Sequence, residues 1–177
     1  MNMKEHILAA LREQFNRWEE LLESLSEEQI AVWRGRSIGV IFQFFQLLPS
    51  LTVLENVVLP MDFGRKYSRG ERRQRAMQLL EMVGVADQAH KLPSRLSGGQ
   101  QQRAAIARAL APDPLLVLAD EPTASLDHAH GGPLMDLMAE LAAERGTTFL
   151  VASHDPAVIA RAHRVFRLAD GRLVEAP

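Results

Sequence analysis

The chain alternates between helix-like and strand-like hydrophobic patterns. Between residues 4 and 25 apolar side chains recur at steps of three and four, which predicts an amphipathic helix. Residues 115–119 and 147–152 are instead continuous apolar runs, as expected of buried strands, and residues 37–42 form a shorter β-branched run. Strands that alternate with helices predict an α/β fold with parallel strands. The stripe of the first helix consists of Leu8, Leu11, Phe15, Trp18, Leu22 and Leu25.

Two helix starts are expected where a serine precedes Gln or Glu by three residues, an arrangement called a capping box. Ser26 with Gln29 would open a short turn. Ser68 with Glu71 would open a longer helix, which Gly84 is expected to end because glycine readily adopts the left-handed conformation found there.

Glycine and proline mark the ends of other elements. Residues 51–58 look helical up to Pro60, and residues 134–145 form an expected helix that Gly146 stops. The chain is expected to close with a hairpin of residues 165–168 and 172–174.

Composition limits the possible functions. The length of 177 residues fits one domain, and 47% hydrophobic with 24% charged residues is ordinary for a globular protein. A net charge of −2 gives no overall positive field to hold nucleic acid, so we expect no nucleic-acid partner. The absence of cysteine excludes disulfides and thiol catalysis and fits a reducing cytoplasm.

No part of the sequence is expected to cross a membrane. No window approaches the ~20 consecutive apolar residues that a bilayer requires. Residues 1–28 mix charged with apolar positions and lack the core of a signal peptide. We therefore expect a cytoplasmic location.

Polar residues follow three of the expected strands. They are Gln43, Asp120 with Glu121, and Ser153 with His154. Because ligands of α/β sheets bind at the carboxyl ends of strands, these groups are expected to converge on one edge. Asp120 is suited to hold magnesium through water, and Glu121 to polarise an attacking water. The alternative is an acidic pair in an ordinary turn.

A second candidate site lies at Ser97-Gly98-Gly99-Gln100, before an expected helix that runs to Leu110. Unpaired amide groups at a helix start, together with the helix dipole, attract anions such as phosphate. The alternative is a plain serine N-cap followed by two glycines. His154 could likewise contact a phosphate or simply be a satisfied histidine, and Gln43 could contact a metal or cap a helix.

Five ordered motifs together resemble the ATP-binding-cassette (ABC) ATPases. The resemblance covers residues 33–177 and implies the α/β core of a P-loop NTPase, with a helical subdomain at about residues 44–111. Residues 42–57 are most similar to the subclass that releases lipoproteins or exports macrolides. The motifs are the Q-loop at Gln43, the signature at residues 96–103, the Walker B strand at residues 115–123, the D-loop at residues 125–127 and the H-loop at His154-Asp155.

The resemblance implies a role for each candidate residue. Glu121 would be the general base and His154 would steady the γ-phosphate of ATP. Asp120 would organise Mg²⁺, and Gln43 would sense both the metal and the nucleotide. Ser97, Gly98, Gly99 and Gln100 would contact the ATP of a partner subunit, and Asp127 would lie across the dimer seam.

The resemblance also implies partners. Two ABC ATPase subunits of the family dimerise head to tail, each ATP lies between them, and the helical subdomain grips an integral membrane permease. We therefore expect ATP and Mg²⁺ as cofactors, a second ATPase subunit and a permease as partners, and a peripheral position at the inner face of the cell membrane.

One element of the pattern does not occur in the sequence. The P-loop, or Walker A motif, has the form Gly-x-x-x-x-Gly-Lys-Ser/Thr because its amide groups cradle phosphate and its lysine neutralises it. The 177 residues contain no Gly-Lys pair. We therefore expect a cassette truncated before the Q-loop, with weak nucleotide binding and no ATP hydrolysis of its own.

Residues 1–32 stand where relatives carry the P-loop and the first strands. Their helical pattern resembles the opening helix of the DinB-like four-helix family, and we expect an N-terminal amphipathic helix that is not ABC-like. The alternative is a family-specific extension.

Three functions are compatible with these observations. The first is an ATP-binding subunit of an ABC transporter, which couples ATP binding and hydrolysis to a permease. The second is a non-enzymatic partner that regulates a complete cassette. The third is a gene-fusion remnant whose cassette portion does not fold, because a parallel sheet without its central strands leaves open hydrophobic edges.

Overall fold

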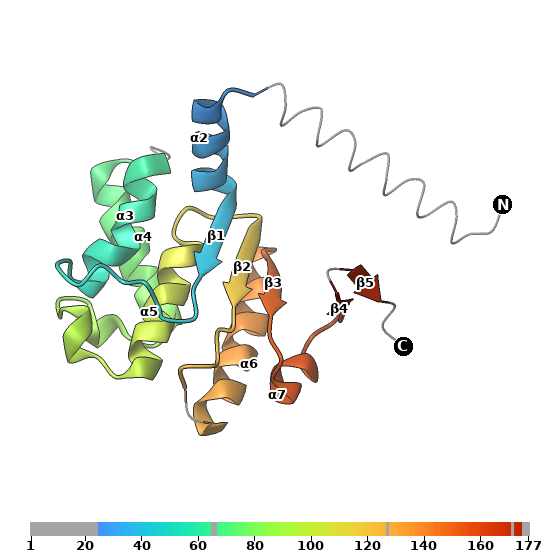
Figure 1. Ribbon diagram of the computed structural model, residues 1–177. Helices are drawn as coiled ribbons and strands as arrows, with labels where there is room; N and C mark the ends of the chain where they lie inside the picture. The colour runs from blue at the N-terminus through green and yellow to red at the C-terminus, as the bar shows by residue number, and fades with distance from the viewer. Residues whose placement is uncertain (1–24, 65–66, 127, 171, 175–177) are drawn as a thin grey trace.

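A three-stranded parallel sheet lies at the centre of the molecule. The computed structural model describes residues 25–64, 67–126, 128–170 and 172–174. Strands β1 (Ile38–Ile41), β2 (Leu116–Asp120) and β3 (Thr148–Ala152) pair in the order β1-β2-β3 (Figure 1). Both pairings are parallel. The predicted α/β fold with parallel strands is therefore confirmed.

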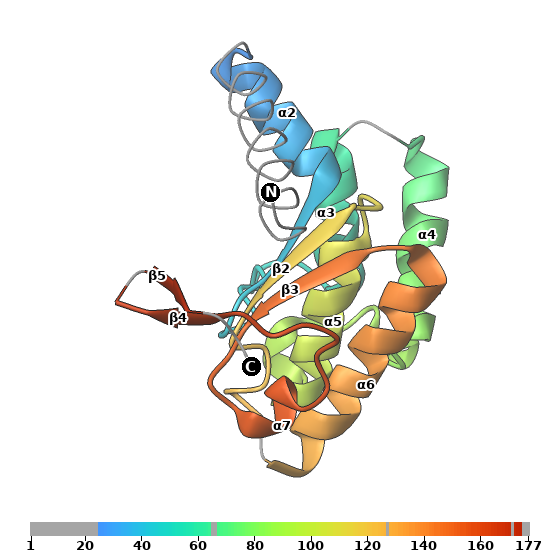
Figure 2. The same cartoon turned by 90° about the vertical axis from the view of Figure 1, so that its right-hand side faces the viewer.

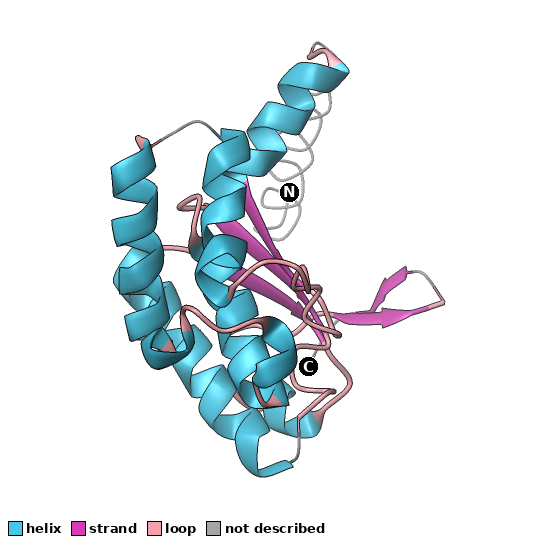
Figure 3. Ribbon diagram, turned by 90° about the vertical axis from the view of Figure 1, so that its left-hand side faces the viewer, coloured by secondary structure: helices cyan, strands magenta, loops and turns pink. Residues whose placement is uncertain are grey.

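Helices cover one face of this sheet (Figures 2 and 3). Within the described residues no helix is both long and apolar enough to cross a membrane. The helices are α2 (Glu27–Ser37), α3 (Val53–Gly64), α4 (Arg69–Met82), α5 (Gly98–Leu110), α6 (His128–Arg145) and α7 (Pro156–Ile159), with 3₁₀ turns at Ala86–Gln88 and Pro93–Arg95.

The expected helix starts are confirmed. The Ser26 hydroxyl accepts from the backbone N–H of Gln29, while the Gln29 side chain accepts from the N–H of Ser26. Ser68 caps α4 in the same way, and this helix ends just before Gly84, whose φ is +71°. Ser97 and Gln100 form a third capping box at the start of α5. Local hydrogen bonding alone fixes these starts.

Two helices extend further than their sequence pattern indicates. Helix α3 continues through Pro60 to Gly64, and α6 begins at His128 and includes Pro133. A proline removes one backbone hydrogen bond, but neighbouring side chains can compensate by burial. Met61 follows Pro60 and is fully buried, and Leu134 follows Pro133 and is almost so. Packing therefore outweighs the local cost of each proline.

The chain closes with the expected hairpin. Strands β4 (Arg167–Ala169) and β5 (Arg172–Val174) pair antiparallel as a separate two-stranded sheet. The helix predicted over residues 4–25 lies outside the described residues, except for Leu25.

Helix α5 forms the centre of the core. Its side chains pack against β1 on one side and against α3 and α4 on the other. Ile106 and Leu110 of this helix are fully buried, as are Ile41 of β1 and Val117 of β2. The contact with β1 is very close, because a Cβ atom at Gly39 would lie 2.3 Å from the carbonyl oxygen of Ala109. Only glycine fits at this position.

Replacing Gly39 with alanine should therefore destabilise the fold. The new methyl group would press on the α5 backbone, and overpacking of this kind costs roughly 1–3 kcal/mol of unfolding free energy. Urea denaturation measures the loss. Gly35→Ala is the matched control, because nothing lies within 4 Å of that position in α2, and there alanine should stabilise the helix by about 0.5–1 kcal/mol. Equal stability of the two variants would contradict the close contact.

Candidate functional site

The three strands of the sheet end at one edge, as expected. Their arrowheads point towards the end of the molecule at which α5 begins (Figure 1). Glu121 follows β2 directly and has a φ of +43°, in the left-handed region. Its N–H donates to the carbonyl oxygen of Ala152 at 2.9 Å. Such a conformation costs a non-glycine residue about 1–3 kcal/mol and is often found at functional sites.

Glu121 and His154, two predicted catalytic residues, are in direct contact. The Oε1 atom of Glu121 lies 2.6 Å from His154 Nδ1 and accepts from the His154 backbone N–H at 3.2 Å. Its Oε2 atom accepts from the Ser153 hydroxyl at 2.9 Å. The Glu121 side chain is 22% exposed, whereas that of His154 is 88% exposed. The carboxylate is thus held from both sides next to an accessible imidazole.

This contact shifts both acid–base equilibria. Burial alone would raise the pKa of Glu121, but the hydrogen bonds from His154 and Ser153 outweigh it and bring the pKa below its ordinary value. The hydrogen bond and the negative charge of Glu121 raise the pKa of His154. In this arrangement the Glu121 carboxylate is ionised, and both of its oxygens are hydrogen-bonded to neighbouring residues. Glu121 would have to leave His154 before it could take a proton from water.

Asp120 provides the other carboxylate of this edge. It is the last residue of β2 and is exposed, whereas Ala119 before it is buried on the helix side of the sheet. No group of three or more His, Asp or Glu residues that could hold a metal occurs among the described residues. Magnesium at a nucleotide site needs only one or two carboxylates, with phosphate and water completing its shell. An exposed Asp120 beside Glu121 fits this requirement.

Gln43 is joined to the same edge through its backbone. Its carbonyl oxygen accepts from the Ser125 hydroxyl at 2.8 Å. The loop that contains Ser125 is in turn held by α5, since the buried Gln102 donates from Nε2 to the Pro122 carbonyl at 2.7 Å. Three motifs that lie far apart in the sequence are therefore connected by hydrogen bonds.

Arg108 and Asn56, which the sequence did not single out, hold the loop after Gln43. Phe45 and Gln46 both have positive φ values, and Arg108 of α5 donates to both of their carbonyl oxygens. Asn56 of α3 is fully buried and bonds the backbone of this loop at Leu48. The signal for Asn56 is its position three residues after Val53, which places it on the apolar face of the helix.

The start of α5 lies beside this loop. A Cβ atom at Gly98 would be 3.7 Å from the Ser125 carbonyl oxygen and 3.8 Å from the Phe45 ring. Ser97 is exposed, whereas Gly99 and Gln100 are half-buried. Ser97 and Gln100 bond one another in their capping box, which leaves the hydroxyl proton of Ser97 able to donate to a ligand. Asp127, the remaining candidate, lies outside the described residues.

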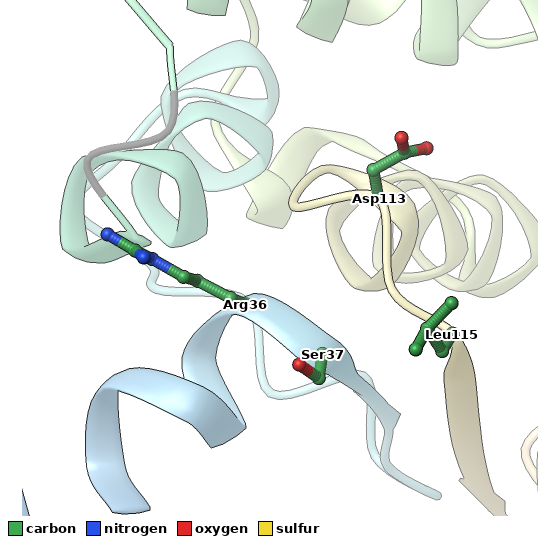
Figure 4. Close-up of a pocket in the computed structure, with 4 residues that line it drawn as sticks. All are labelled: Arg36, Ser37, Asp113 and Leu115. Atoms are coloured by element: carbon green, nitrogen blue, oxygen red, sulfur yellow. The ribbon is translucent and has the colours of Figure 1, made fainter. Parts of the chain in front are cut away.

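Two hollows of the surface lie elsewhere. One, of about 410 Å³, is lined by Arg36, Ser37, Asp113 and Leu115, which precede β1 and β2. Figure 4 shows that the Arg36 side chain extends away from Leu115. The other, of about 390 Å³, lies along α2. Both are at the amino side of the sheet, so the candidate residues at the carboxyl edge line neither.

The contact between Glu121 and His154 predicts that His154 loses its proton at a higher pH than an ordinary histidine. We expect His154 to titrate above its ordinary pKa of 6.5 by NMR. Because the pKa of His154 is raised and that of Glu121 is lowered from 4.5, the pair should stabilise the fold most between pH 4.5 and 6.5. Stabilisation is lost as the pH rises through the pKa of His154 or falls through that of Glu121.

Two variants test this titration. Glu121→Gln removes the charge and should return the pKa of His154 towards its ordinary value. Ser153→Ala keeps the carboxylate and should leave the pKa of His154 raised. An unchanged titration of His154 in Glu121→Gln would contradict the contact.

Sequence comparison relates the chain to a known family. The sequence model of the ABC transporter family matches residues 7–124. This match begins within residues 1–32, and the boundary expected at residue 32 stays a prediction. The lipoprotein-releasing system ATP-binding protein LolD 2 of Rhodospirillum rubrum is 49% identical over 150 residues, which cover 85% of this chain and 65% of that protein. LolD of Pseudomonas syringae pv. tomato is 46% identical over 157 residues, with 89% and 69% covered.

Solved structures agree with the sequence relatives. The ATP-binding cassette MJ0796, in a dimeric post-hydrolysis state bound to ADP and Pi, is 42% identical and superposes with a TM-score of 0.75 over 86% of this chain and 67% of that one. The structure of cbiO1 from Clostridium perfringens, part of an ABC transporter complex, is 33% identical with a TM-score of 0.77, and 85% of this chain and 60% of that one are covered.

The matched relatives are longer than this chain. The chain spans 60–69% of the length of the curated relatives it matches. Within that span the family match, the sequence identity and the superposition with solved cassettes all agree. The chain therefore belongs to the ABC transporter family, as an ATP-binding cassette similar to the lipoprotein-releasing LolD proteins.

Proposed function

We propose that this chain acts as an ATP-binding subunit of an ABC transporter, which couples ATP binding and hydrolysis to a membrane permease. Cassettes of this family bind ATP with Mg²⁺ and act as dimers with permeases. The observation that carries the proposal is the contact of Glu121 with His154 and Ser153, next to the exposed Asp120. Groups suited to act as a base, a cation ligand and a phosphate contact thus lie near one another at one edge of the sheet.

Each residue has a defined part in this function. Asp120 would hold Mg²⁺, which supplies charge neutralisation for the phosphates when bound. Glu121 would orient and deprotonate a water after His154 has turned away from it. The raised pKa of His154 favours the imidazolium form, which suits contact with the negatively charged γ-phosphate. Gln43 would report the state of the site through Ser125, which bonds its carbonyl.

The start of α5 would act on a second subunit. Ser97, Gly98 and Gly99 present a hydroxyl and backbone N–H groups at the positive end of the helix dipole, and donors of this kind bind phosphate. In a head-to-tail dimer these donors would face the ATP of the partner cassette. The chain would then lie at the cytoplasmic face of the membrane without entering it.

A second function would use only the start of α5, where Ser97 and Gln100 form a capping box. The 177 residues contain no Gly-Lys pair, and so no P-loop to cradle the β- and γ-phosphates. The chain could serve as a non-enzymatic partner that only offers its α5 start to a complete cassette. We expect the 177-residue chain alone to show ATP hydrolysis at background level, because its phosphates would not be neutralised. Turnover that Glu121→Gln abolishes would contradict this expectation.

Mixing with a complete cassette tests both functions. The partner is a related cassette whose own signature serine has been replaced by arginine, so that its ATP needs the α5 start of this chain. We expect a mixed dimer with Mg-ATP by size-exclusion chromatography. Ser97→Arg in this chain should weaken it roughly 10–100-fold, because charge-assisted hydrogen bonds worth about 1.5–3 kcal/mol are lost.

Glu121→Gln separates the two functions in the same assay. If this chain uses its own carboxylate, the ATP turnover of the mixed dimer falls in this variant. If the chain only lends its helix start, turnover is unchanged in Glu121→Gln, while Ser97→Arg still weakens dimer formation. No mixed dimer at all, or a mixed dimer that Ser97→Arg leaves intact, would refute both.

A further inference from the structure

A fully buried glutamine of α5 lies beside the turn that follows β2. Gln102 is in the second turn of α5, five residues after Ser97. Its Nε2 atom donates to the Pro122 carbonyl oxygen at 2.7 Å. Its Oε1 atom is also buried, and among the described residues this oxygen has no hydrogen-bond partner. One half of the side-chain amide is therefore satisfied and the other half is not.

The orientation of this amide follows from its partner. A carbonyl oxygen only accepts hydrogen bonds, so the NH₂ group of Gln102 has to face Pro122, and turning the amide over would set two acceptors against each other. A buried polar atom without a partner destabilises a fold, and most such atoms in native proteins are paired. Methionine, an apolar side chain of similar length, would avoid the buried Oε1. What glutamine contributes at this position is therefore the bond to Pro122.

The turn that Gln102 reaches begins with Glu121. The N–H of Ala124 donates to the Glu121 carbonyl oxygen at 3.1 Å and closes the turn. Pro122 is the second residue of the turn and is buried. Glu121 itself has a left-handed backbone, a conformation that persists only where the surroundings hold it. The bond from Gln102 is one of the contacts that hold it.

Two further hydrogen bonds tie the same turn to other parts of the fold. The Glu121 N–H donates to the Ala152 carbonyl oxygen of β3 at 2.9 Å. The Ser125 hydroxyl donates to the Gln43 carbonyl oxygen, in the loop after β1, at 2.8 Å. Gln102 adds the connection to α5. The place of Glu121 is thus defined relative to β3, to the loop after β1 and to α5.

Helix α5 is the more rigid partner in this connection. Its residues Ile106 and Leu110 are fully buried, and its carbonyl at Ala109 lies against Gly39 of β1. The turn after β2 contains exposed residues, among them Ala124 and Ser125. Loss of the Gln102 bond would therefore loosen the turn and leave α5 in place.

We propose that Gln102 is a positioning residue, which sets the place of the Glu121 turn relative to the start of α5. The inference rests on the proposed function, in which Glu121 acts on a water and Ser97 on the ATP of a partner subunit. From Ser97 to Gln102 the path along α5 is about 7.5 Å. One hydrogen bond then leads to Pro122, the neighbour of Glu121. Two groups that act on different nucleotides are in this way held at a fixed separation.

Amide hydrogen exchange, followed by NMR on the 177-residue chain without nucleotide, tests the positioning. Gln102→Met keeps an apolar side chain of similar length in the core and removes the donor. We expect the Ala124 amide to exchange roughly tenfold faster in this variant, because the turn loses one of its anchors. The amide of Ala107, in the buried middle of α5, should keep its rate because the core is unchanged.

Gln88→Met is the matched control. Gln88 is also a buried glutamine, and it bonds its own neighbours in the 3₁₀ turn after α4, where Lys91 donates to its Oε1 atom at 2.6 Å. The same substitution there should leave the exchange of Ala124 unchanged. Gln102→Leu, a second apolar replacement, should reproduce the result of Gln102→Met.

Three results would overturn the proposal. The first is an Ala124 amide that exchanges at the same rate in Gln102→Met as in the unsubstituted chain. The second is an equal acceleration at Ala107, which would mean that the bond supports the whole fold rather than the turn. The third is that neither Gln102→Met nor Gln102→Leu folds, which would make the role of Gln102 purely structural.

The mixed dimer with a complete cassette supplies a readout that a structural role would not produce. We expect Gln102→Met to form this dimer with Mg-ATP as readily as the unsubstituted chain, because Ser97 stays on its helix. ATP turnover should fall roughly tenfold or more, because Glu121 is displaced. An equal loss of dimer formation and turnover would contradict the positioning role. If Glu121→Gln leaves turnover unchanged, the enzymatic form of the proposed function fails, and the exchange of Ala124 still decides whether Gln102 positions the turn.

Discussion

The burial of helix α5 is the constraint on which the other parts of this cassette depend. Its alanine-rich inner face packs against β1, and its opposite side is covered by α3 and α4. The close approach is between Ala109 of α5 and Gly39 of β1, because a Cβ atom at Gly39 would collide with the Ala109 carbonyl. Because α5 is fixed by the core, its first turn has a defined position at the carboxyl edge of the sheet. Ligand-binding groups are more accurately placed on such rigid elements than on loops.

The same helix also orders the loops that carry the candidate chemistry. Gln102 bonds the turn after β2, and Arg108 bonds the loop after β1. Ser125 then joins these two loops by its contact with Gln43. Glu121 and His154 are connected to each other rather than to α5, so they form a separate pair just after strands β2 and β3. A movement of α5 would therefore reach the loop after Gln43 through Arg108, and the turn after Glu121 through Gln102 and Pro122.

The features that sequence alone predicts are those with local causes. The helix starts at Ser26 and Ser68 depend on hydrogen bonds within four residues, and the convergence of Glu121 and His154 follows from parallel strands. The passage of α3 through Pro60, and the hold of Arg108 on two distant carbonyls, depend on tertiary packing that periodicity does not contain. The roles of the candidate residues in ATP binding remain predictions.

The contact between Gly39 and Ala109 gives α5 the geometry of a lever. Ala109 lies one residue from the C-terminal end of α5, which has 13 residues. The first turn of α5 is therefore almost a full helix length away from this contact. With a helix length of about 20 Å, a tilt of roughly 3° about this point displaces the first turn by about 1 Å. A displacement of that size is enough to make or break a hydrogen bond to a phosphate oxygen. Small rotations at a tightly packed pivot can thus regulate a contact formed at the opposite end of the helix.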